Sequence, residues 1–209
     1  MFKPIKLQLW PRLRQMLLGW GCVGVAYTLG SLWQGHAMVL PETALDRMIP
    51  FNPVGVWFYL SFFVLIPVTY LVAEFDRLRW LTAAMQVCAV VSGIFFIAWP
   101  TTLHYPSISG DGLSVALLRL LSAADSSHNC LPSLHGALTL LCVWALVDAR
   151  CWLRSIFAVV CGLCICFSII QLRRHISIDL GAGLLTGLMS GWLCQLQAAT
   201  RPDNKVLPL

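Results

Sequence analysis

The chain has 209 residues, of which 58% are hydrophobic and 11% are charged, and its formal net charge is +5. Soluble domains carry about 25% charged residues, so this composition excludes an ordinary soluble domain and indicates an integral membrane protein. The basic residues form no cluster with interleaved aromatic side chains, which argues against a nucleic-acid partner.

Apolar stretches recur along the whole chain, and crossing a bilayer as a helix takes about 20 mostly apolar residues. No long polar linker or repeat separates them, so we expect a single membrane-embedded domain over residues 1–209. The stretches predict an all-α integral membrane protein with six transmembrane helices, over residues 17–33, 54–73, 81–99, 134–147, 155–170 and 176–196.

The first stretch follows four basic residues, Lys3, Lys6, Arg12 and Arg14. A cleaved signal peptide also begins with basic residues, but this segment is long for one and no small-residue cleavage site follows it cleanly. We therefore expect a retained helix.

Two longer connections separate the early spans. Residues 40–57 carry three prolines and are expected to form the first outer loop. Residues 100–132 contain "GDGLSVALLRLLSAAD", in which apolar residues recur at helical spacing after a Gly-Asp-Gly breaker. This pattern predicts an amphipathic helix at the outer interface between spans 3 and 4; the alternative is a plain surface linker.

The lysines and arginines alternate between the two sides of the expected spans. The amino-terminal tail, the loops "EFDRLRW" and "DARCWLR" and the carboxyl-terminal tail are basic, whereas the intervening segments carry only Arg47, Arg119, Arg173 and Arg174. By the positive-inside rule both termini are cytoplasmic. We expect a location in a bacterial inner membrane, with residues 128–135 and 173–175 facing the periplasm or exterior.

Nine cysteines are present, but only Cys130 falls in an expected outer segment, so we expect no intramolecular disulfide. The run "CGLCIC" has spacing typical of metal ligands, yet it lies in mid-span without a nearby histidine or carboxylate. Small, polarizable packing residues are the better interpretation.

The segment "QLRRHISIDLGAG" combines residues suited to phosphoryl chemistry. His175 and Asp179 are four residues apart, so on a helix the carboxylate reaches one imidazole nitrogen, fixes the tautomer and leaves the other nitrogen free to attack or to bind a metal. Arg173 and Arg174 directly precede them and offer forks of donors suited to phosphate oxygens.

A second polar segment, "HNCLPSLHGALTL", directly precedes an apolar helix. Pro132 suits the first helical turn, and the backbone amides at a helix start can bind an anion. Ser133 and His135 lie at that start, so together with the arginines they form a candidate phosphate site on the outer side.

"NCLPSLHGA", followed about forty residues later by "RRHISIDLGAG", resembles the type 2 phosphatidic-acid phosphatase superfamily. In particular it resembles the branch that contains inositol phosphorylceramide synthase. "DRMIPFNPVGVWFYL" is similar to the first outer loop and second helix of that branch.

The resemblance implies that His175 is a nucleophile that forms a phosphohistidine, oriented by Asp179. It also implies that His135 protonates the leaving oxygen and then activates the acceptor, while Ser133 and nearby amides hold phosphate oxygens. The superfamily's first-motif lysine position is occupied by Ala98, and the usual Ser-Arg pair of the third motif reads Ser168-Ile169.

Three residues are therefore expected to replace the missing cationic clamp: Arg173, Arg174 and His104.

The sequence thus predicts a lipid phosphatase or phosphotransferase that needs neither metal nor cofactor. Its substrate is a phospholipid, sphingolipid or prenyl phosphate; water as acceptor gives a phosphatase, and an alcohol or polyol gives a phosphotransferase. The alternative from another class is a non-enzymatic transporter that uses the His, Asp and Arg cluster for anion or proton passage. A metal site is disfavoured because the adjacent arginines would repel a cation.

Overall fold

A computed structural model describes residues 9–32 and 35–200 of the chain, which are mostly helical. The elements in chain order are α1 (Leu9–Leu32), β1 (Met38–Val39), α2 (Ala44–Met48), η2 (Pro53–Gly55), α3 (Val56–Val72), α4 (Phe75–Ala98), β2 (Thr101–Thr102), α5 (Leu113–Ala124), α6 (Leu134–Leu146), η3 (Ala149–Cys151), α7 (Trp152–Gln171) and α8 (Ser177–Thr200). β1 and β2 pair in parallel, with Met38 opposite Thr101.

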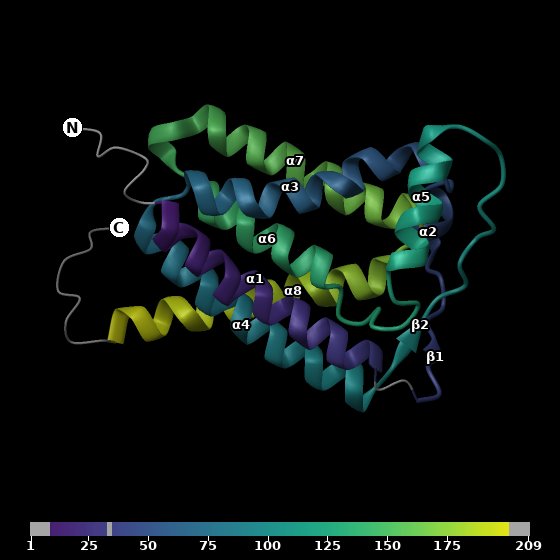
Figure 1. The fold of residues 1–209 in the computed structure, drawn as a ribbon, viewed down its shortest axis with the longest axis horizontal. Helices are drawn as coiled ribbons and strands as arrows, with labels where there is room; N and C mark the ends of the chain where they lie inside the picture. The colour runs from purple at the N-terminus through teal and green to yellow at the C-terminus, as the bar shows by residue number, and fades with distance from the viewer. Residues whose placement is uncertain (1–8, 33–34, 201–209) are drawn as a thin grey trace.

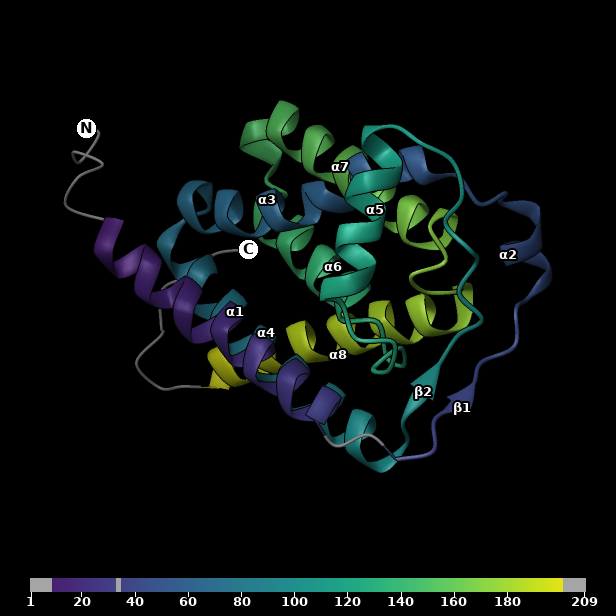
Figure 2. The same cartoon turned by 45° about the vertical axis from the view of Figure 1, so that its right-hand side comes forward.

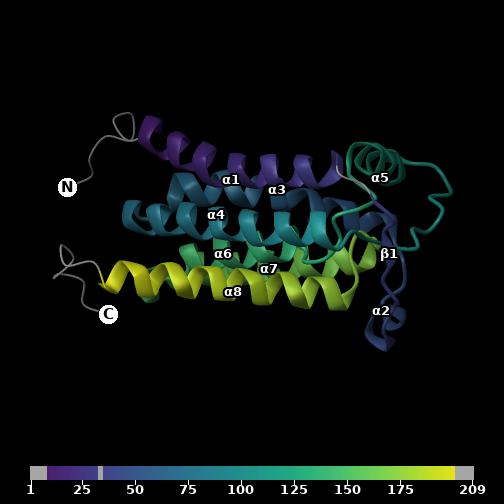
Figure 3. The ribbon, with the colours of Figure 1, turned by 90° about the horizontal axis from the view of Figure 1, so that it is seen from below.

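Six helices form a bundle that runs along the long axis of the molecule: α1, α3, α4, α6, α7 and α8 (Figure 1). The start of α1 and the end of α8 lie at one end of this bundle, whereas α2, α5 and the strand pair lie at the other (Figure 3). Helix α6 packs against α3, α4, α7 and α8, so it is the central helix. Figure 2 shows that the turn between α7 and α8 lies at the same end as α2 and the strands.

Each of the six expected apolar stretches overlaps one of these six helices, although the ends differ by several residues and residue 33 lies outside the described part of the chain. Three helical segments are long and apolar enough to cross a membrane: Pro53–Val72, Phe75–Ala98 and Ala149–Gln171. Helix α6 has only 13 residues.

Helices α1 and α4 begin earlier than the apolar pattern predicts, at Leu9 and Phe75, because their first turns carry arginines. Arg12 donates to backbone carbonyls at the end of α3, and Arg77 donates to carbonyls at the end of α6. The last carbonyls of a helix have no partner within it, so these arginines satisfy groups that would otherwise be orphaned.

Residues 113–124 form the helix expected between the third and fourth apolar stretches, not a plain linker. Helix α5 buries Val115 and Leu118 and exposes Leu113 and Leu120. It contacts η2 and α3, and so covers the end of the bundle at which α7 turns into α8.

Close packing of α8 on α6 depends on glycine. A Cβ atom added to Gly183 would lie 2.1 Å from the backbone oxygen of Ser133, and one added to Gly187 would lie 2.7 Å from that of Ala137. Both obstacles are backbone atoms, which cannot rotate away. The contact brings the first turn of α8 against the start of α6.

We expect Gly183→Ala to destabilise the protein by about 1–3 kcal/mol, because the added methyl group forces the two helices apart. The matched control is Gly181→Ala on the same helix, where an added Cβ meets no atom within 4 Å. Alanine favours a helix over glycine by up to about 1 kcal/mol, so this control should be neutral or stabilising. Thermal unfolding of the two variants in detergent is the measurement, and equal stabilities would contradict the close contact.

Candidate active site

The turn between α7 and α8 is a Schellman motif. The N–H of Arg173 donates to the carbonyl of Ile170 at 3.0 Å, and that of Arg174 donates to the carbonyl of Ile169 at 3.1 Å. Arg173 occupies the left-handed position of the motif with φ of 52°, where glycine is usual and another residue costs about 1–2 kcal/mol. This reversal leads directly into the His175 to Asp179 segment.

The guanidinium of Arg173 is occupied by protein groups. Its Nη2 donates to the carbonyls of Asp46 at 2.6 Å and Ile49 at 2.8 Å, Nη1 donates to the carbonyl of Ile170, and Nε bonds a carboxylate oxygen of Glu42 at 3.0 Å. These bonds attach the segment around α2 to the turn. The guanidinium of Arg173, expected to bind phosphate, thus bonds three backbone carbonyls and one carboxylate of the protein.

The structure brings together the three residues expected to be catalytic. His175 Nδ1 lies 2.6 Å from Asp179 Oδ2, and His175 Nε2 lies 3.3 Å from His135 Nδ1. Asp179 is fully buried, and its Oδ1 accepts the backbone N–H groups of Ile176 at 2.7 Å and Leu180 at 3.0 Å. A buried carboxylate held in this way keeps the adjacent imidazole in one orientation.

Of the other two residues expected in the site, Ser133 lies beside the histidine pair and His104 does not. Ser133 is fully buried at the N-cap of α6, where its Oγ accepts the N–H of Gly136 and its own N–H donates to the carbonyl of Asp179. Its hydroxyl therefore caps the amino-terminal end of the helix that carries His135. His104 is exposed in the segment after β2, and no hydrogen bond joins its side chain to the described residues.

Arg174 points in another direction from Arg173 and forms a partly buried ion pair with Asp125. Its Nη2 lies 2.7 Å from Asp125 Oδ2, Nη1 donates to Ser122 Oγ at 3.2 Å, and the guanidinium carbon lies 5.0 Å from the ring centre of Tyr105. Burial alone would raise the pKa of Asp125, but the charge of Arg174, together with hydrogen bonds from Arg174 and Tyr27 and the nearby His135, outweighs this effect and holds the pKa below its ordinary value. Asp125 also accepts a hydrogen bond from the hydroxyl of Tyr27 on α1.

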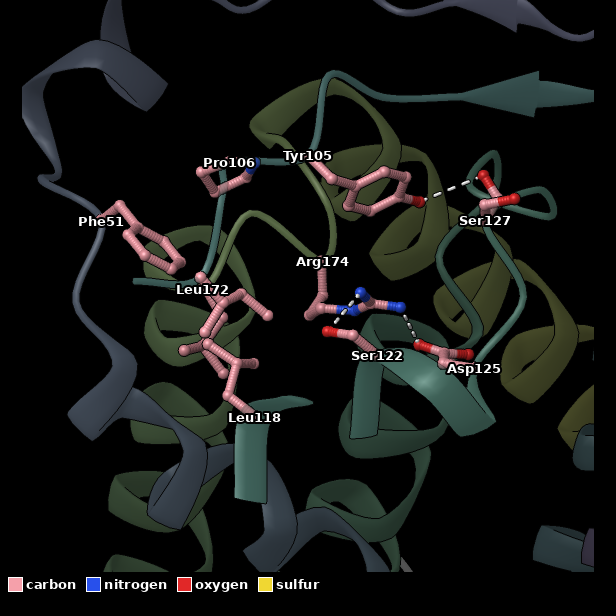
Figure 4. A pocket seen from close by; sticks show the side chains of 10 residues that line it. Phe51, Tyr105, Pro106, Leu118, Ser122, Asp125, Ser127, Leu172 and Arg174 are labelled. Carbon is pink, nitrogen blue, oxygen red and sulfur yellow. Dashed lines mark hydrogen bonds and ion pairs between the residues drawn. The ribbon is translucent and has the colours of Figure 1, made fainter. Parts of the chain in front are cut away.

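The guanidinium of Arg174 faces a cavity of about 350 Å³ (Figure 4). Figure 4 shows its polar wall, formed by Arg174, Ser122 and Asp125, opposite an apolar wall with Phe51 and Leu172. The Nε of Arg174 is buried and, among the described residues, has no hydrogen-bond partner. A buried donor without a partner is costly, so this atom favours an acceptor such as a phosphate oxygen.

Asp46 is a buried site residue that the sequence analysis did not identify. Its carboxylate closes a capping box with Thr43 and accepts the N–H of Ser177 at 2.7 Å and the Ser177 hydroxyl at 3.1 Å. Ser177 begins α8, two residues after His175. Asp46 and the Arg173 guanidinium therefore hold both sides of the Arg174–His175 segment. The spacing Thr-x-x-Asp was the available signal, since it is typical of a capping box.

We expect Asp46→Asn to lower the free energy of unfolding by about 1.5–3 kcal/mol, because an amide NH₂ would face donors that a carboxylate accepts. Burial would raise the pKa of Asp46, but hydrogen bonds from Thr43 and Ser177 outweigh it and lower the pKa. Its contribution is thus complete at neutral pH and is lost as the pH falls through the lowered value.

Chemical unfolding at pH 7 and pH 3 measures this difference, with the exposed Asp111→Asn as the control. The difference between Asp46→Asn and wild type should shrink at pH 3. A difference that stays constant with pH would contradict a charged, hydrogen-bonded Asp46.

Within residues 9–32 and 35–200, no three His, Cys, Asp or Glu side chains are arranged to hold a metal ion. The chain matches no protein-family model, and no curated protein matches it in sequence.

Proposed function

We propose that this protein is an integral membrane enzyme that cleaves a phosphate ester or diester of a lipid through a phosphohistidine on His175. The observation that carries the proposal is the line of three groups in which buried Asp179 holds His175 Nδ1 while Nε2 faces His135. An imidazole whose first nitrogen is bonded to a carboxylate presents its second nitrogen as a nucleophile.

Each group has a defined part in the reaction. The lone pair of His175 Nε2 attacks phosphorus, the bond from phosphorus to the leaving oxygen breaks, and protonated His135 gives that oxygen its Nδ1 proton. Arg174, which lines the cavity, supplies positive charge that stabilises the phosphoryl oxygens. In the second half, neutral His135 takes a proton from water or an alcohol as the acceptor oxygen attacks phosphorus, and the bond from phosphorus to His175 Nε2 breaks.

In the proposed membrane orientation the axes of the six bundle helices run across the bilayer. The end of the bundle where α1 begins and α8 ends would face the cytoplasm, and the histidine pair would face the periplasm or exterior. The positive-inside rule supports this orientation, since Arg12, Arg77 and Arg154 lie at the first end.

The resemblance to the type 2 phosphatidic-acid phosphatase superfamily supports the same chemistry, because the two quoted motifs supply the residues that meet in the site. A phospholipid, sphingolipid or prenyl phosphate is the proposed donor. The cavity beside Arg174 has one polar and one apolar wall, which suits an amphiphilic substrate.

Transport is less well supported than catalysis. A transporter is expected to carry ionisable groups near the middle of the membrane. The buried aspartate, arginine and histidine residues of the described chain instead gather at one end of the bundle: Asp46, Arg173, Arg174, His175 and Asp179.

The test is incubation of the purified protein with radiolabelled phospholipids, sphingolipids and prenyl phosphates, each with and without added alcohols. We expect labelled phosphate in water or a labelled phosphoryl alcohol when an acceptor is present. Vanadate, which mimics five-coordinate phosphorus, should inhibit, whereas a chelator should not. Failure of folded protein to turn over any donor, combined with anion or proton flux in liposomes, would favour transport.

A further inference from the structure

A tyrosine on α3 extends the catalytic line to four side chains. Tyr59 is 1% exposed, and its hydroxyl lies 2.8 Å from His135 Nε2. The order in space is therefore Tyr59, His135, His175 and Asp179, joined by contacts of 2.8, 3.3 and 2.6 Å. Tyr59 belongs to α3 and His135 to α6. His175 lies in the turn that follows α7, and Asp179 lies in α8.

The carboxylate at one end of this line determines where the protons lie. Ionised Asp179 can only accept, so His175 Nδ1 carries a proton and the neutral ring has a lone pair on Nε2. His135 Nδ1 must then be the donor in the 3.3 Å contact, which leaves a lone pair on His135 Nε2. The Tyr59 hydroxyl donates to that lone pair. In the resting protein every hydrogen bond therefore points from Tyr59 toward Asp179.

We infer that Tyr59 is the positioning residue for the acid–base histidine, His135; this inference rests on the proposed function for its kinetic meaning. A hydroxyl both donates and accepts. When His135 is protonated on Nε2, the same Tyr59 oxygen accepts that proton's hydrogen bond. Nδ1 can therefore gain and lose its proton while the ring keeps its place.

The surroundings of His135 leave the tyrosine hydroxyl as its polar partner on the Nε2 side. The ring centres of Phe62 and Tyr59 lie 4.6 and 4.9 Å from that of His135, so aromatic groups pack against the imidazole. The titratable and charged groups that face it are Tyr59, His175, Asp125 and Arg174. Asp125 and Arg174 pair with each other, so neither replaces the hydroxyl at Nε2.

The tautomer can be measured without any turnover, which separates this inference from the proposed function. In ¹⁵N-histidine-labelled full-length protein in detergent, the His135 resonances are assigned by their loss in His135→Gln. We expect a protonated Nδ1 and a bare Nε2 at neutral pH in the wild type. Tyr59→Phe should leave the proton on Nδ1 but shift the Nε2 resonance toward that of an imidazole nitrogen without a hydrogen bond, because the donating hydroxyl is lost.

The control for this spectrum is Tyr70→Phe, which removes another buried hydroxyl from α3, one that bonds Thr82 and Met85 and not His135. Its His135 resonances should match the wild type. A wild-type proton on Nε2, or identical spectra for Tyr59→Phe and Tyr70→Phe, would overturn the inference.

Kinetics with two leaving groups give the second readout. Protonation by His135 matters for an alkyl phosphate but little for nitrophenyl phosphate, whose leaving group departs as an anion. Tyr59→Phe should lower kcat for the alkyl ester by about 10- to 100-fold and for the nitrophenyl ester by less than about 3-fold. Equal losses for both esters would mean a merely structural role. If neither ester is turned over by the wild type, the proposed function fails while the tautomer measurement still decides this inference.

Discussion

Replacement of His175 by asparagine should abolish turnover of the lipid substrate, with a loss of kcat of at least about 10⁴-fold. No second nucleophile is available in the line, since the tautomer inferred above puts a proton on His135 Nδ1, the nitrogen that lies 3.3 Å from His175 Nε2. The asparagine amide can still donate to Asp179, so the buried carboxylate retains a partner and the fold should survive. The measurement is kcat together with thermal unfolding of the same preparation.

The matched control for this variant is His104→Asn, an exposed histidine in the segment after β2. The control should keep kcat near the wild-type value. Wild-type activity in folded His175→Asn would remove His175 from the chemistry.

Asp179→Asn should lower kcat by about 10³- to 10⁴-fold with little change in KM, because the wrong tautomer of His175 becomes favoured. The remaining asparagine oxygen can still accept the N–H groups of Ile176 and Leu180, as Oδ1 does now. The amide NH₂ would then face His175 Nδ1, which must become the acceptor. The proton moves to Nε2, and the attacking lone pair is lost.

The control for Asp179→Asn is Asp76→Asn, an exposed residue in the first turn of α4 at the far end of the bundle. Steady-state kinetics of both variants measure the effect. A loss of less than about 10-fold in Asp179→Asn would contradict the orienting role, because a wrong tautomer costs far more.

The helices and the pairing of His175 with Asp179 could be predicted from the sequence, because both depend on the spacing of residues close together in the chain. Apolar runs of nearly spanning length predict helices whatever packs against them, and His175 and Asp179 meet because they are four residues apart. Ser133 and His135 at a helix start could likewise be placed on the same side as this pair.

The partners of the two adjacent arginines could not be predicted from the spacing of residues in the chain. Both were expected to bind phosphate, yet Arg173 adopts a left-handed conformation and its guanidinium bonds carbonyls near α2, while Arg174 meets Asp125. The left-handed backbone conformation of Arg173 turns the two neighbouring side chains in different directions. An L residue there is unusual, so the sequence gives no sign of it.

Tyr59 and Asp46 depend on contacts between distant segments. Tyr59 reaches His135 across 76 residues, and Asp46 reaches Ser177 across 131 residues. In the sequence, Tyr59 is one of several aromatic residues in an apolar stretch, and its contact with His135 appears only when α3 packs on α6. Asp125 follows an amphipathic helix, and its ion pair with Arg174 becomes evident only when the two segments are placed side by side.

The central claim is the covalent phosphohistidine, and the most direct measurement is its capture. Wild-type protein mixed with ³²P-labelled donor and quenched in alkali, which preserves phosphohistidine, should carry label on the peptide that contains His175. His175→Asn, prepared in parallel, should carry none. Label on another residue, or no phosphoenzyme together with inversion of configuration at phosphorus during turnover, would contradict the account.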